Sequence, residues 1–139
     1  MTLVRNAAIT IAIAALAACA SMGGGTTVRL SLSGAQEAPP VSTSASGSGS
    51  VTIGDDGSVS GSVSVTGMNA VAAHIHQGAR GANGPVIVPF TKSADGNWGP
   101  AAGAKLNDAQ MAAFKAGNLY VNVHSPQHKG GEVRAQLQP

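Results

Sequence analysis

The sequence has 139 residues, of which 10% are charged and 3% aromatic, and its formal net charge is +2. A chain of this length is expected to form one domain. Its eight basic residues are balanced by six acidic ones, which leaves no basic patch of the kind that nucleic-acid binding requires, so we expect no nucleic-acid partner. Nineteen glycines with many serines and threonines indicate short strands joined by turns and exclude a helical bundle.

The first 18 residues have the pattern of an export signal. Arg5 is the only charge before an apolar run over residues 7–18, which ends at Cys19. The run is shorter than the about 20 apolar residues of a membrane-spanning helix, and its charged start and small-residue end are typical of a signal peptide. Residues 16–19 resemble a bacterial lipobox. We therefore predict a lipoprotein signal peptide over residues 1–18 and a lipid on Cys19; the alternative is an ordinary signal peptide with an incidental cysteine.

Lipidation sets the expected location of the protein. We expect export and lipid anchoring to a membrane facing the periplasm, with the outer membrane as the expected one. Residues 19–27 then form the lipidated cysteine and a flexible tether, and residues 28–139 form the folded domain. Because Cys19 is the only cysteine, the domain has no internal disulfide and depends on burial, backbone pairing or a metal.

The strand patterns begin at residues 28–32, where apolar residues occupy alternate positions. Residues 36–50 are rich in Pro, Ser, Thr and Gly, which predicts a loop. Asp55-Asp56-Gly57 stands between two alternating runs, 51–53 and 58–65, and this is the clearest hairpin pattern in the chain. Further strands are expected at residues 72–76, 86–90, 119–124 and 131–137.

One helix is expected over residues 109–116. Asn107 or Asp108 can cap its start, and Gly117 stands at the expected stop. Its apolar side would be formed by Leu106, Met111 and Phe114. About six to eight short strands with a single helix predict an all-β fold, an antiparallel Greek-key β-sandwich with one short helix.

All four histidines lie in two short segments. His74 and His76 stand two residues apart in a predicted strand, so their side chains point to one face, about 7 Å apart along the strand. His124 ends another predicted strand, and His128 follows a Ser-Pro-Gln bend that could turn it back towards the same ion. The pattern predicts a metal site; surface or hydrogen-bonded histidines are the alternative for a His-X-His pair alone.

Imidazole ligands without thiolate or carboxylate suit copper, zinc, nickel or iron better than calcium or magnesium. Copper is the best match for an exported protein, and zinc stays an alternative. Met68 could add a thioether ligand, although a methionine in the core is commoner. Asn122 or Glu132 could accept the other ring N–H of a ligand histidine. Arg80 could steer anions to the metal, although an exposed arginine is commoner.

The order of these segments resembles the CHRD-domain family, named for the repeated domain of chordin. The resemblance is carried by residues 73–86, which begin Ala73-His74-Ile75-His76-Gln77-Gly78, and by residues 119–124 continuing to residues 130–137. Residues 32–41 look like the opening strand and loop of the family. In all, the resemblance covers about residues 28 to 138.

The resemblance implies a β-sandwich of immunoglobulin-like or superoxide-dismutase-like topology. The His-X-His strand is also similar to the copper-binding strand of Cu,Zn superoxide dismutases. By that likeness His74, His76 and His124 stand at metal-ligand positions, with His128 as a fourth. The chain lacks the zinc loop of the dismutases and their disulfide, so dismutase activity does not follow.

Taken together, the sequence predicts a membrane-tethered periplasmic copper-binding protein that sequesters, buffers or transfers the metal. One alternative is a copper-dependent redox enzyme of superoxide-dismutase type. Another is a metal-independent extracytoplasmic interaction module. The sequence shows no Ser-His-Asp arrangement in a strand-turn-helix context and no phosphate loop, so an enzyme is not the first expectation. It names no protein partner.

Overall fold

The computed structural model describes residues 23–139. The predicted signal peptide and the predicted lipidation site at Cys19 lie outside these residues. Within them no helix is long and apolar enough to cross a membrane. In chain order the elements are β1 (Gly25–Ser33), the 3-10 helix η1 (Gly34–Gln36), β2 (Ser46–Gly54), β3 (Val59–Thr66), β4 (Ala72–Gln77), β5 (Val86–Ala94), β6 (Asn97–Pro100), α1 (Asp108–Lys115), β7 (Leu119–His124) and β8 (Val133–Leu137).

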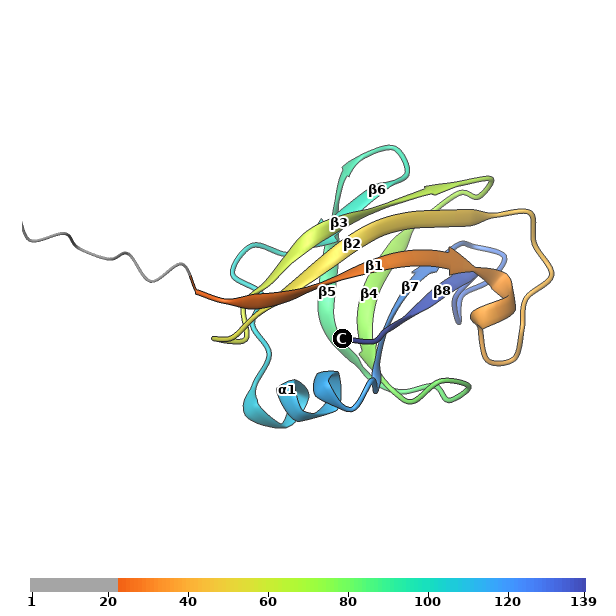
Figure 1. Ribbon diagram of the computed structural model, residues 1–139. Helices are drawn as coiled ribbons and strands as arrows, with labels where there is room; N and C mark the ends of the chain where they lie inside the picture. The colour runs from red at the N-terminus through yellow and green to blue at the C-terminus, as the bar shows by residue number, and fades with distance from the viewer. Residues whose placement is uncertain (1–22) are drawn as a thin grey trace, which may run out of the picture.

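The strands close into one antiparallel barrel in the order β1-β2-β3-β6-β5-β4-β7-β8 (Figure 1). The predicted all-β class with one short α-helix is confirmed, but the predicted β-sandwich is wrong. Two separate sheets cannot be drawn, because β6 pairs with β3 on one side and with β5 on the other. On the opposite side of the barrel, Ser33 of β1 pairs with Arg134 of β8 and completes the closure.

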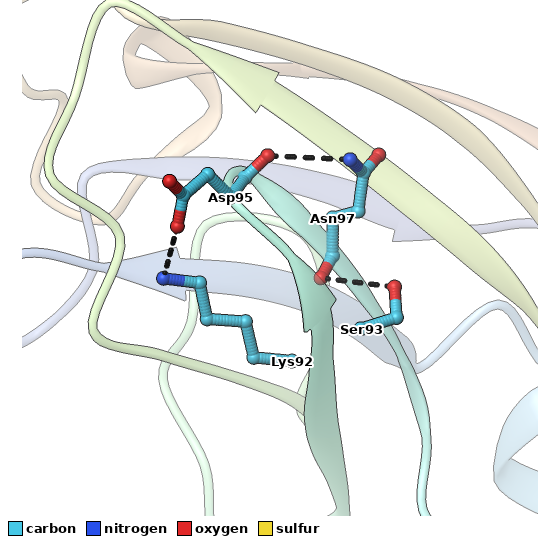
Figure 2. A network of polar contacts seen from close by, with 4 residues as sticks. All are labelled: Lys92, Ser93, Asp95 and Asn97. Atoms are coloured by element: carbon cyan, nitrogen blue, oxygen red, sulfur yellow. Dashed lines mark hydrogen bonds and ion pairs between the residues drawn. The ribbon is translucent and has the colours of Figure 1, made fainter.

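Strand β6 was not expected from the sequence, because Asn-Trp-Gly-Pro is short and carries three turn-forming residues. A tight turn from β5 holds it in place (Figure 2). Lys92 Nζ lies 2.8 Å from Asp95 Oδ1, and the Asn97 amide donates to the Asp95 carbonyl at 3.2 Å. The Ser93 hydroxyl donates to the Asn97 carbonyl oxygen at 3.4 Å. Trp98 then becomes buried between β3 and β5.

The predicted strand boundaries differ from the observed ones mainly in the first hairpin. Strand β1 begins at Gly25, ahead of the predicted start, and β2 begins at Ser46, inside the loop predicted over residues 36–50. Glycine and serine are common in loops. In this segment, however, small residues are needed because the adjacent strand β3 packs closely against it. A Cβ on Gly47 would lie 2.8 Å from Val65 Cγ1 of β3. Close approach between strands therefore decides the conformation of this segment.

The predicted hairpin around Asp55-Asp56-Gly57 is confirmed, with Ile53 of β2 opposite Val59 of β3. Its Gly57 has φ +85, a conformation that glycine adopts without strain. The Gly57 carbonyl accepts from the Leu106 N–H at 2.9 Å. This hydrogen bond ties the turn to the segment that precedes α1.

Helix α1 lies close to its predicted position, at one end of the barrel (Figure 1). Asn107 caps it: its side chain accepts from the Gln110 N–H at 2.8 Å, and the Gln110 side chain accepts from the Asn107 N–H at 2.9 Å. Leu106 and Phe114 are buried, and Met111 packs against the same core. The helix therefore seals the apolar interior at this end.

The barrel topology brings the two histidine segments together. Strand β7 returns to lie beside β4, the arrangement of a Greek-key connection. Inward positions on these strands are apolar and fully buried: Ala73, Ile75, Val121 and Val123. Because side chains alternate along a strand, the outward positions hold His74, His76, Tyr120, Asn122 and His124. The outer face of the β4–β7 pair thus carries the polar residues of both segments.

Candidate metal centre

Three of the four histidines form one group on the outer face of β4 and β7. His74, His76 and His124 each offer a ring nitrogen, and these three atoms all lie within 4.8 Å of one another. The closest pair is His74 Nδ1 and His124 Nε2, at 3.0 Å. The prediction that these side chains share a face is confirmed, and strand pairing explains it: His124 stands opposite Ala72, diagonal to His74.

The ring of His76 is oriented by a backbone carbonyl. Its Nδ1 lies 2.9 Å from the Gly84 carbonyl oxygen. A carbonyl oxygen only accepts, so Nδ1 carries the proton and Nε2 presents a lone pair. That Nε2 is buried and has no hydrogen-bond partner. A buried acceptor without a partner is costly, and a metal ion would satisfy it.

His124 is fixed in the same way, with Nδ1 donating to the Lys129 carbonyl at 2.9 Å. Its Nε2 therefore accepts the proton that His74 Nδ1 donates. For His74 to bind a metal through Nδ1, its proton has to move to Nε2. His74 is half-buried, whereas His76 and His124 are buried. Backbone carbonyls thus fix the tautomers of His76 and His124, whereas the tautomer of His74 can change.

The surroundings of His74 and His124 disfavour their charged forms. Burial lowers the pKa of His74, the neighbouring His124 and His76 add to the shift, and together they bring it to about 4. Burial also lowers the pKa of His124; the hydrogen bond to the Lys129 carbonyl opposes this shift, and the charge on His76 adds to it. His74 and His124 are therefore neutral at neutral pH, which is the form that binds metals.

His128 and Met68 are not brought into this group among residues 23–139. His128 belongs to a turn in which its N–H donates to the Ser125 carbonyl at 3.1 Å and to the Ser125 hydroxyl at 3.2 Å. Met68 is partly buried and packs against the hydrophobic core. The structure thus clusters three of the predicted ligand residues, and His128 and Met68 lie outside that cluster.

The residues expected to support the ligands have other partners. The Glu132 carboxylate accepts from the Thr43 hydroxyl at 2.6 Å. Arg80 is exposed and donates to the Gln138 side chain at 3.2 Å. Neither Asn122 nor Glu132 accepts a histidine N–H, because the backbone carbonyls of two loops take that role.

Asn122 instead links the outer face of β7 to a buried carboxyl group. Its amide nitrogen lies 3.2 Å and 3.3 Å from the two Glu37 oxygens and 3.2 Å from the Gly130 carbonyl. Burial raises the pKa of Glu37 to about 7, although the Asn122 hydrogen bond and the charge of Arg134 lower it. Glu37 is 5% exposed, so this pair fastens the loop after β1 beside the histidines.

Sequence reasoning missed four contributors to the centre: Glu37, Tyr120 and the carbonyls of Gly84 and Lys129. Tyr120 could have been found, because it stands two residues before Asn122 on the same strand and so shares its face. The two carbonyls could not have been found, because every residue has a carbonyl group and only the loop conformation directs it towards a histidine ring. Glu37 also gave no signal in the sequence. Its burial depends on the loop after β1 folding against β7, which is distant in sequence.

The chemistry of the group follows from its donors. Three imidazole nitrogens on one face of a sheet match the ligands of zinc or copper, with bonds of about 2.0–2.1 Å. Drawing the nitrogens to that distance needs ring movements of about an ångström. The orphaned His76 Nε2 is the observation that best fits an ion at this place.

Comparison with known proteins gives one finding. A model of the CHRD domain family matches residues 28–137. The curated proteins and the solved structures give no match. The matched range contains the three histidines and both loops whose carbonyls orient them.

Proposed function

We propose that this chain, which belongs to the CHRD domain family, is a copper-binding protein that sequesters, buffers or transfers the metal through His74, His76 and His124. The buried Nε2 of His76, which has no partner, carries the proposal. Imidazole-only ligation supports copper, with zinc as the competing metal. His128 is not part of the proposed ligand set, because it lies outside the clustered group.

Binding followed by transfer is favoured by the unequal burial of the three ligands. His76 and His124 are buried and held by carbonyls, whereas His74 is half-buried. A ligand that faces solvent can be exchanged for a ligand of an incoming partner. The proposed lipid on Cys19 would keep this exchange at a membrane surface facing the periplasm, as expected for the outer membrane.

Equilibrium dialysis against copper, followed by metal analysis, tests the proposal. The parent protein should take up one copper per chain, and His74→Ala and His124→Ala should each lose most of the affinity. His128→Ala is the matched control and should bind like the parent. Equal copper uptake by all four proteins would show that the ligands lie elsewhere.

A copper-dependent redox enzyme of superoxide-dismutase type is the second candidate. The half-buried His74 favours it, because such an enzyme needs a side of the metal that substrate can reach. The copper-loaded protein would have to dismutate superoxide faster than free copper does. A chain that binds neither copper nor zinc would instead be the metal-independent interaction module.

A further inference from the structure

Three side chains from three neighbouring strands form a stack beside the metal group. His76 of β4 stands opposite Tyr120 of β7, and their rings are stacked, with centroids 4.9 Å apart and planes 8° from parallel. The guanidinium carbon of Arg134, on β8, lies 3.4 Å from the centre of the Tyr120 ring. Since β7 lies between β4 and β8, the cation and the imidazole cover opposite faces of the tyrosine.

The tyrosine and the arginine are themselves fixed. Arg134 is 1% exposed and Tyr120 is 2% exposed. Arg134 donates to the carbonyls of Ala79 and Ala82 at 3.0 Å and 2.9 Å, and to the Gln136 side chain at 3.2 Å. The guanidinium therefore links β8 to the loop that follows β4. It also packs against the face of the buried Tyr120 ring.

Gly84 connects the stack to the ligand. Its N–H donates to the Tyr120 hydroxyl at 3.1 Å, and its carbonyl accepts from His76 Nδ1 at 2.9 Å. The imidazole is therefore held at its edge by the carbonyl and on its face by the phenol ring. Both contacts leave Nε2 directed away from the loop, where it stays without a partner.

We propose that Tyr120, backed by Arg134, is a positioning residue that fixes the tautomer and the ring plane of His76 for metal binding. The proposal rests on the metal-binding function proposed above. A cation over an aromatic ring is an electrostatic attraction that holds the ring in place. Outer residues that orient a histidine ligand typically change metal affinity 10–100-fold, and Tyr120 acts in this way from the ring face.

Two variants separate the ring from its hydroxyl. Tyr120→Leu removes the stack, whereas Tyr120→Phe keeps it and loses the hydrogen bond from Gly84. In the metal-free protein, ¹⁵N NMR of the His76 ring should show the Nδ1–H tautomer in the parent and in Tyr120→Phe, and a mixture in Tyr120→Leu. Zn²⁺ affinity, measured by chelator competition, should fall about 10–100-fold in Tyr120→Leu and change less than about threefold in Tyr120→Phe.

Arg134→Met is the second test should Tyr120→Leu not fold, because it removes the cation and keeps a long side chain. It should also produce a mixture of His76 tautomers. An unchanged tautomer and unchanged Zn²⁺ affinity in a folded Tyr120→Leu, or in Arg134→Met if the first does not fold, would overturn the proposal. If the parent binds neither Zn²⁺ nor copper, the metal-binding function fails, while the NMR comparison still decides whether the stack positions His76.

Discussion

At the scale of single residues, the protonation of the three histidine rings decides what the group can bind. The carbonyls of Gly84 and Lys129 accept hydrogen bonds from the Nδ1–H groups of His76 and His124. Both Nε2 atoms therefore keep their lone pairs. His74 then has to present its Nδ1, because that atom faces His124 Nε2 at 3.0 Å. Binding of a metal ion by both nitrogens therefore requires the His74 proton to move from Nδ1 to Nε2.

The half-buried His74 and the buried Glu37 have pKa values shifted in opposite directions in the metal-free protein. His74 has its pKa lowered to about 4 from 6.5, so the stability it contributes is present above about pH 6.5 and is lost as the pH falls towards 4. Glu37 has its pKa raised from 4.5 to about 7, so its contribution is present below about pH 4.5 and is lost as the pH rises through 7.

Replacing Glu37 should make the contribution of His74 to the pH dependence of stability easier to measure. The metal-free Glu37→Gln variant lacks the opposing titration, so its free energy of unfolding should rise more steeply from pH 4.5 to 7 than that of the parent. The difference should be about 2 kcal/mol across this range. Urea unfolding at several pH values measures it. Parallel profiles for the parent and the variant would show that Glu37 is ionised alike in the folded and unfolded chains.

The clustering of the three histidines was easier to predict from the sequence than their surroundings. Alternation in a strand was enough to put His74 and His76 on one face and His124 on the polar face of its own strand. It could not place Glu37, whose burial depends on a loop folding over β7, nor keep His128 out of the group, because the bend before it is set by hydrogen bonds to Ser125.

At the scale of elements, the loop between β4 and β5 connects two strands and also carries the Gly84 carbonyl that accepts from His76. A Cβ on Gly84 would collide with the Gln77 carbonyl oxygen. Any larger residue would therefore move the carbonyl that orients His76. Gly130, in the loop between β7 and β8, offers a contrast, because a Cβ there meets nothing within 4 Å.

These two glycines give a matched pair of variants. Gly84→Ala should shift the loop and lower Zn²⁺ affinity at least tenfold, as expected when the partner of a ligand histidine is displaced. Gly130→Ala should leave the affinity within about twofold of the parent. Chelator competition measures both, and circular dichroism checks the fold. Equal affinities for the two variants would mean that the Gly84 carbonyl does not orient the ligand.

Most elements could be predicted from the sequence, but their assembly could not. The hairpin at Asp55-Asp56-Gly57 and the cap at Asn107 depend on local chemistry, and both are observed. Strand β6 and the first half of β2 are made of turn-forming residues and become strands only through pairing with neighbours. The strand pattern predicted a β-sandwich, whereas pairing through β6 closes the strands into one barrel.

At the scale of the whole molecule, barrel closure places the histidine group on a closed and packed sheet. The inner side of β4 and β7 is filled by residues with at most 1% exposure, such as Ile75 and Val121. Loops that follow β1, β4 and β7 fold onto the outer side and are fixed by Glu37, Arg134 and His124. Strands and loops together therefore set the positions of the three ligands.

The proposed location makes a separate prediction about the whole chain. Expressed in a bacterium with its first residues intact, the parent should be found in the membrane fraction. Cys19→Ser should move to the soluble periplasmic fraction, because it lacks the lipid acceptor. Membrane fractionation with immunoblotting measures this. A variant that stays with the membrane to the same extent as the parent would show that the attachment does not depend on a lipid at Cys19.

Electron paramagnetic resonance of the protein loaded with one equivalent of Cu²⁺ tests the metal centre most directly. We predict hyperfine coupling to several nitrogens in the parent, and a loss of nitrogen coupling in His76→Ala and His124→Ala but not in His128→Ala. The parent spectrum should also differ from that of copper in buffer. A parent spectrum equal to that of free copper, or one unchanged by removing His76 and His124, would contradict a copper site at these histidines.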